Sequence, residues 1–213
     1  MHSDNNYVSL TGKVIAEPTF SHEVFGEGFY VVNLEVPRLS QAYDILPVTV
    51  SERIMDRDAF ICGNYINICG QIRSYNNYVE SEGRNRLILT VFTRDYQIID
   101  CDPSRSVNDV FLNGFICKPP MYRTTPFGRE ISDLLVAVNR SYNKSDYVPC
   151  ITWGRNARFC GRLGVSDNVK LWGRLQSRIY QKKYDDGTVV DKVAYEVSVS
   201  KVEVAEREED DTP

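Results

Sequence analysis

The stretch Val169-Lys170-Leu171-Trp172-Gly173-Arg174-Leu175-Gln176-Ser177-Arg178-Ile179-Tyr180 alternates between apolar and polar or aromatic residues. Successive side chains of a β-strand point to opposite faces of the sheet. Val169, Leu171 and Leu175 would therefore face a core. The opposite face would carry Trp172, Arg174, Gln176, Arg178 and Tyr180. The stretch predicts a half-buried strand with an aromatic and basic outer face.

The neighbouring segments predict further strands. Alternation recurs at residues 134–138 and 193–199, and Asp185-Asp186-Gly187 is typical of a turn that would join two long strands into a hairpin. A short helix is expected over residues 155–163. Five strands with a short helix between the third and the fourth is the strand order of an OB-type barrel. The fold class predicted here is all-β.

This pattern occurs twice in the chain. Leu10 and Gly12 match Leu112 and Gly114 at a spacing of 102 residues, and further on Gly70 matches Gly173 at 103. We therefore expect two tandem OB-type domains, at residues 1–100 and 108–205. Residues 101–107 would form a linker and 206–213 an acidic tail. The first copy would have its own short helix at residues 52–61.

Charge separates the two copies. Residues 1–107 hold 9 Lys and Arg against 14 Asp and Glu, residues 108–205 hold 15 against 10, and residues 206–213 hold 1 against 5. The net charges are about −5, +5 and −4. A basic segment beside an acidic tail favours binding of a polyanion by the second copy.

Other classes of function find little support in the sequence. The six cysteines form no CxxC pair and the two histidines, His2 and His22, both lie near the start, so neither a metal site nor a cofactor is expected. No nucleophile–base pair, glycine-rich phosphate loop or carboxylate cluster indicates an enzyme. The sequence carries neither a signal-peptide pattern nor a long apolar run, so a cytoplasmic location without membrane contact is expected.

Aromatic and basic residues are interleaved through the second copy, which is typical of single-stranded nucleic-acid binding, because unpaired bases stack on aromatic rings while Arg and Lys contact phosphates. The expected contact residues are Tyr142, Tyr147, Trp153, Tyr180, Trp172, Arg140, Lys144, Arg155, Arg174, Arg178, Lys182 and Lys183.

The second copy resembles the bacterial single-stranded DNA-binding protein family, in a tandem variant. The resemblance rests on five stretches in family order, at residues 108–114, 124–128, 136–140, 146–155 and 172–178. It implies that aromatic residues at Tyr142, Tyr147, Trp153 and Tyr180 stack on DNA bases. It also implies roles in replication, recombination or repair, and a homodimer, since the family gathers four OB domains.

The first copy keeps the strand pattern but lacks most of the aromatic residues expected to contact DNA. Ser40, Ile45 and Ser51 stand where the second copy has Tyr142, Tyr147 and Trp153. Weaker DNA contacts are expected from Gln71, Arg73, Tyr75 and Tyr78. The acidic tail resembles the family's partner-binding tip but lacks its final aromatic residue, so recruitment of protein partners through it is not expected.

Three functions remain open at this point. The leading one is sequence-independent binding of single-stranded DNA. The second is an accessory or adaptor of the same fold, for example a primosomal or mobile-element protein that acts through protein partners. The third is RNA binding, because stacking faces and phosphate contacts serve both polymers.

Overall fold

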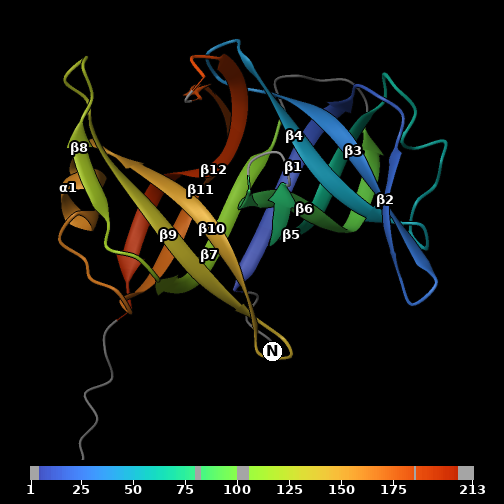
Figure 1. Ribbon diagram of the computed structural model, residues 1–213. Helices are drawn as coiled ribbons and strands as arrows, with labels where there is room; N and C mark the ends of the chain where they lie inside the picture. The colour runs from blue at the N-terminus through green and yellow to red at the C-terminus, as the bar shows by residue number, and fades with distance from the viewer. Residues whose placement is uncertain (1–4, 80–82, 100–105, 185, 206–213) are drawn as a thin grey trace, which may run out of the picture.

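The computed structural model describes residues 5–79, 83–99, 106–184 and 186–205. Within them lie twelve strands and one helix (Figure 1). The strands of the first half are β1 (Asn6–Val14), β2 (Thr19–Val24), β3 (Glu27–Pro37), β4 (Tyr43–Ser51), β5 (Tyr65–Val79) and β6 (Arg84–Ile99). The second half contains β7 (Asn108–Ile116), β8 (Met121–Thr124), β9 (Glu130–Arg140), β10 (Lys144–Trp153), α1 (Gly154–Cys160), β11 (Asn168–Lys183) and β12 (Val189–Val204).

Both halves have the same topology. The sheet order is β2-β3-β4-β6-β5-β1 in the first half, and it is repeated as β8-β9-β10-β12-β11-β7 in the second. Additional β1–β3 and β7–β9 pairings close each half into a barrel. The predicted all-β fold of two like barrels is therefore confirmed, and Figure 1 shows the two lying side by side. The predicted linker and acidic tail lie almost wholly or wholly outside the described residues.

The prediction of five strands per copy missed one short strand in each. These are β2 and β8, which pair only with β3 and β9 and lie at the two ends of the continuous sheet. All described side chains of both strands are exposed, so neither strand has the alternating burial that sequence patterns reveal.

The helix predicted at residues 52–61 of the first copy is wrong, because hydrogen-bonded turns replace it. Two backbone N–H groups that a helix would use bind side-chain oxygens instead: Asp56 N donates to Tyr96 Oη at 3.0 Å, and Asp58 N donates to Asp56 Oδ1 at 3.1 Å. Side-chain bonds of this kind compete with helix formation. In the second copy α1 forms, but it ends at Cys160 rather than residue 163.

The core of each barrel is built by alternation. Val169, Leu171 and Leu175 are buried, as predicted for the inner face of β11. A β-bulge follows Trp172, where β11 meets β12. A Cβ on Gly173 would stand 2.3 Å from the backbone oxygen of Ser198, and one on Gly70 at the matching bulge would stand 2.2 Å from that of Phe92. The two glycines therefore allow the close backbone approach that bends these strands.

An approximate two-fold axis relates the two barrels. β1 pairs antiparallel with β7, and Val8 stands opposite Val110, its own equivalent in the repeat. A second contact obeys the same symmetry. The Asp44 carboxylate accepts a hydrogen bond from Ser177 N (2.6 Å), and the Asp146 carboxylate accepts one from Ser74 N (2.8 Å). Both carboxylates are fully buried, and they are paired with Arg38 and Arg73 respectively. These reciprocal contacts fix how the barrels face each other.

No helix among the described residues is both long and apolar enough to cross a bilayer.

Candidate nucleic-acid interface

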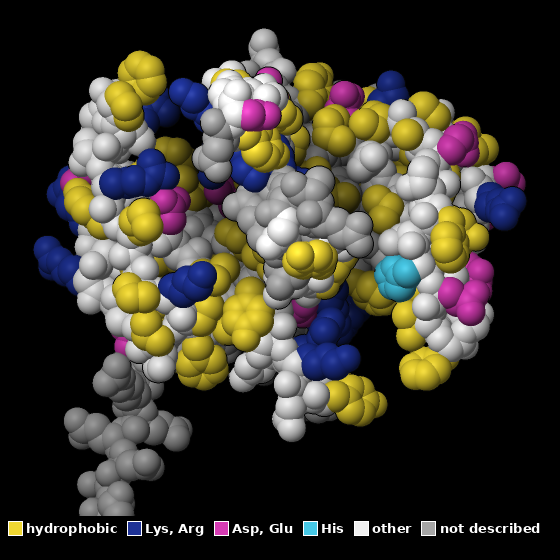
Figure 2. Space-filling view, in the orientation of Figure 1, with side chains coloured by type: hydrophobic (Ala, Val, Ile, Leu, Met, Phe, Trp, Pro, Cys, Tyr) yellow, Lys and Arg dark blue, Asp and Glu magenta, His cyan; other side chains and the backbone are white. Residues whose placement is uncertain are grey.

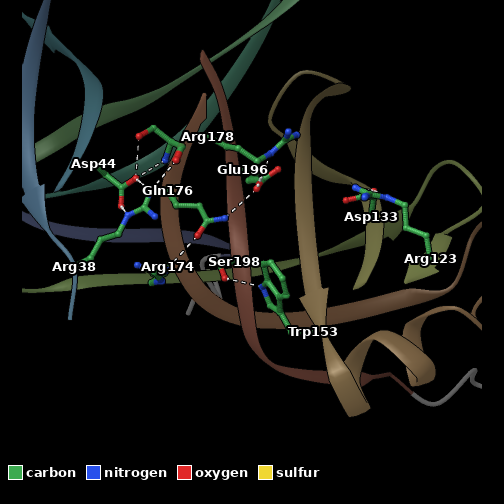
Figure 3. A network of polar contacts seen from close by, with 11 residues as sticks. Arg38, Asp44, Arg123, Asp133, Trp153, Arg174, Gln176, Arg178, Glu196 and Ser198 are labelled. Atoms are coloured by element: carbon green, nitrogen blue, oxygen red, sulfur yellow. Dashed lines mark hydrogen bonds and ion pairs between the residues drawn. The ribbon is translucent and has the colours of Figure 1, made fainter. Parts of the chain in front are cut away.

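The outer face of β10, β12 and β11 carries most of the predicted contact residues, and we call it the β10–β12–β11 face. Trp153 ends β10, and its indole Nε1–H donates to Ser198 Oγ on β12 at 3.2 Å (Figure 3). Ser198 stands opposite Arg174 of β11. Three strands therefore place an indole ring, a hydroxyl and a guanidinium on one surface, with 39% of Trp153 exposed.

A polar network lies behind the two arginines of this face. Arg174 Nη2 donates to Gln176 Oε1 at 3.2 Å, and Gln176 Nε2 donates to Glu196 Oε1 at 2.9 Å (Figure 3). Arg178 Nε lies 3.5 Å from the same carboxylate oxygen. Gln176 lies on the same face as Arg174, as alternation predicted, but both Gln176 and Glu196 are buried. The network instead positions the guanidinium groups of Arg174 and Arg178.

The predicted stacking rings differ in exposure. Tyr142 is 94% exposed in the β9–β10 turn, where a left-handed backbone (φ 63°) projects it into solvent. Tyr147 is 44% exposed on β10, and Tyr180 is half-buried on β11. All three rings have surface that a base can stack on, and the turn presents Tyr142 with fewer neighbours than the strands give the other two.

The end of the β11–β12 hairpin combines rings and cations. Arg178 Cζ lies 5.8 Å from the centre of the Tyr180 ring, and Lys182 Nζ lies 4.3 Å from that of Tyr184. Lys183 is exposed beside them. Pairs of this kind keep positive charge close to aromatic surface, which is the combination that a stacked base and its phosphate require.

The remaining basic residues lie at the edges of the β10–β12–β11 face. Arg140 is the last residue of β9, and its Nη1 lies 3.7 Å from Oδ1 of the buried Asp146. Lys144 begins β10 and is exposed. Arg155 is exposed on the first turn of α1, next to Trp153. The structure therefore brings the predicted set to the rim and surface of one barrel, with Trp172 as the exception.

Trp172 belongs to the section of sheet that joins the barrels. The centre of its ring lies 5.1 Å from that of Phe111 on β7, and Lys201 Nζ lies 4.4 Å from the centre of the Trp172 ring. Tyr7 of β1 stands opposite Phe111. This aromatic group is separate from the set around Trp153, so the contacts of Trp172 favour a packing role.

The corresponding face of the first barrel is different. Arg73 donates to both Asp146 and Gln71, and Gln71 is buried, so these two predicted weak contacts take part in joining and packing the barrels. Burial lowers the pKa of Arg73, while its bond to Asp146 raises it. Tyr75 and Tyr78 are 51% and 60% exposed and keep free ring surface.

The barrels also differ in visible charge. On the side shown in Figure 2, Lys and Arg side chains lie over the second barrel and along the boundary between the barrels, and Asp and Glu side chains gather at the outer side of the first. This agrees with net charges of about −5 for residues 1–107 and +5 for 108–205.

Sequence reasoning missed Arg86. It lies on β6 of the first barrel, and its Nη2 donates to the backbone oxygen of Val193 on β12 at 3.1 Å. No signal in the sequence pointed to it, because the contact depends on how the two barrels pack. Arg38, which ties Asp44 to the carbonyl of Ser177, was missed for the same reason.

The fold and the face define a class, namely a tandem OB-type protein with exposed aromatic and basic side chains on its second barrel. The model of the single-strand binding protein family matches residues 107–205. Single-stranded DNA-binding protein B of Bacillus subtilis (strain 168) is 31% identical over 86 residues, which cover 36% of this chain and 74% of that protein. The chain belongs to the single-strand binding protein family.

Other relatives are matched over a smaller share of their own length. Single-stranded DNA-binding protein A of Bacillus subtilis is 31% identical over 97 residues, covering 42% of this chain and 56% of that protein. Single-stranded DNA-binding protein 1 of Staphylococcus aureus (strain COL) is 33% identical over 84 residues, covering 36% and 50%. The chain thus spans about half the length of these two relatives.

The likeness to solved structures extends over both barrels. The wild-type single-stranded DNA binding protein from Thermus aquaticus covers 95% of this chain, and 93% of its own length is matched, with a TM-score of 0.74 and 20% identity. A deletion mutant of the same protein gives a TM-score of 0.75 and covers 98% of this chain and 96% of its own. At this identity the likeness shows the shared fold.

Proposed function

We propose that this protein binds single-stranded DNA without sequence preference, mainly through the β10–β12–β11 face. The observation that carries the proposal is the joint placement of Trp153, Tyr147 and Tyr180 with Arg174 and Arg178 on neighbouring strands. Aromatic rings stack on any base, and guanidinium groups donate hydrogen bonds to any phosphate, so this binding does not depend on the DNA sequence. Membership of the family supports the same function, with roles in replication, recombination or repair.

A titration with oligo-dT, a duplex of equal length and oligo-U at fixed salt tests the proposal. Tight binding of oligo-dT with much weaker duplex binding supports it, and equal affinities for oligo-dT and duplex would refute it. Tighter binding of oligo-U would make RNA the ligand. If four to six phosphates are contacted, log K should fall against log salt with a slope of about −3 to −4.

The proposal extends to assembly as a homodimer with four barrels. The section of sheet around Trp172, Phe111 and Tyr7 supports it, because Tyr7 is 41% exposed there within an aromatic group. Exposed aromatic surface of this kind is typical of interfaces. Light scattering should give about twice the chain mass of 24.4 kDa, and a mass near that of one chain at micromolar concentration would refute it.

A further inference from the structure

A pocket of about 310 Å³ lies where the two barrels meet, and both of them line it. Arg86 and Ile88 of β6 come from the first barrel, and Pro149, Tyr180 and Tyr195 come from the second. Its volume lies at the lower end of the range for small-molecule pockets, about 300–1,000 Å³. The space therefore suits one flat group rather than a large ligand.

The pocket continues from the β10–β12–β11 face. Tyr180 lies on β11 two residues beyond Arg178, whose Cζ is 5.8 Å from the centre of the Tyr180 ring. Pro149 lies on β10 between Tyr147 and Ile151, on the same side of the strand as Tyr147. A strand bound across the face and reaching Tyr180 would therefore arrive at the mouth of the pocket.

Arg86 is the polar group that the first barrel adds. It reaches across the boundary and donates to the Val193 carbonyl at 3.1 Å. Burial raises the pKa of the half-buried Tyr195 phenol, and Arg86 lies close enough to offset part of that rise. A guanidinium carries five N–H donors, so Arg86 can keep its bond to Val193 and contact an anion as well.

We propose that this pocket is a nucleotide subsite: one base of the bound strand enters it, beside Tyr180, Pro149 and Ile88, and Arg86 contacts the adjoining phosphate. The proposal rests on the proposed function and deepens it. Charge supports this occupant, because Arg86 and Arg178 are both cationic and the nearby carboxylate of Glu196 is already held by Gln176 and Arg178. The acidic first barrel would thus take part in binding through a single cation.

The test compares Arg86→Ala with Arg53→Ala in the full chain, by titration with oligo-dT at several salt concentrations. Arg53 is an exposed first-barrel arginine paired with Glu27, so its removal changes the charge equally without touching the pocket. Arg86→Ala should weaken binding on the order of tenfold and make the salt slope shallower by about 0.7, the value for one phosphate. Arg53→Ala should change neither quantity, and Arg86→Lys should restore the slope.

A double-mutant cycle completes the test. If Arg86 and Tyr180 hold the same nucleotide, Arg86→Ala and Tyr180→Ala should be non-additive, while Arg86→Ala and Tyr142→Ala should add. An unchanged slope would show that Arg86 only holds the barrels together, and the subsite would be wrong. The same conclusion follows if Arg86→Ala behaves like Arg53→Ala while the wild type still binds. If the wild type binds no oligo-dT at all, the proposed function itself fails, and the subsite with it.

Discussion

The buried carboxylate of Asp146 on β10 accepts a hydrogen bond from the backbone N–H of Ser74 on β5, at 2.8 Å, and so ties the second barrel to the first. Its repeat equivalent Asp44 makes the reciprocal contact with Ser177. The way the two barrels sit against each other therefore depends on these two buried carboxylates.

Replacing Asp146 with alanine should destabilise the fold strongly. The change leaves the guanidinium of Arg73, which is 22% exposed, without its carboxylate, and breaking a buried pair costs about 3–5 kcal/mol. Asp133→Ala is the control, because Asp133 pairs with Arg123 on the surface (Figure 3), where such pairs contribute about 0–1 kcal/mol. Urea unfolding followed by circular dichroism measures both. Equal losses would mean that Asp146 does not hold the barrels.

Gly173→Ala should destabilise the protein through the bulge in β11. The new methyl group would stand 2.3 Å from a backbone oxygen, and overpacking of this kind costs about 1–3 kcal/mol. At Gly164 the nearest atom to an added Cβ is 3.9 Å away, so Gly164→Ala should change the melting temperature little. A Gly173→Ala variant that melts with the wild type would contradict the geometry of the bulge.

Cys150 should resist alkylation in the folded protein. Burial, and to a lesser extent the charge of Glu196, raise the pKa of its thiol, and only the thiolate reacts. At pH 8 iodoacetamide should label the exposed Cys62 in the folded protein and the buried Cys150 only after denaturation, with peptide mapping as the readout. Because the folded pKa lies above the unfolded one, its contribution to stability is complete below about pH 8.5 and is lost as pH rises further. Equal labelling of both thiols in the folded state would contradict this.

The sequence predicts the fold class well because alternation is a local signal and the repeat is visible when the chain is compared with itself. Val169, Leu171 and Leu175 could be assigned to the core from spacing alone, and they are buried. The helix expected at residues 52–61 does not form because side-chain oxygens of Tyr96 and Asp56 accept the backbone N–H groups of Asp56 and Asp58, a competition that periodicity does not reveal.

The site is predicted less completely than the fold. Alternation correctly places Gln176 on the same face as Arg174, yet its side chain is buried, where it is bonded to Arg174 and to Glu196 on the neighbouring strand. The contact of Arg86 with Val193 could not be predicted from the sequence, because it depends on how the two barrels pack against each other. The stacking roles of Tyr142, Tyr147, Trp153 and Tyr180 remain predictions that only binding measurements can test.

The central claim is that the second barrel carries most of the stacking, and Trp153→Ala compared with Tyr75→Ala tests it most directly. Loss of one stacked ring should cost about 1–3 kcal/mol, or roughly five- to 150-fold in affinity for oligo-dT. Trp153→Phe should keep most of the affinity, although it loses the indole bond to Ser198.

Tyr75 is 51% exposed on the acidic barrel, so Tyr75→Ala should change affinity less than about threefold, below the range for a stacked ring. Circular dichroism should show all three variants folded. The account predicts a large loss for Trp153→Ala and a small one for Tyr75→Ala in the same titration. Equal losses would contradict it and leave two equivalent DNA-binding barrels.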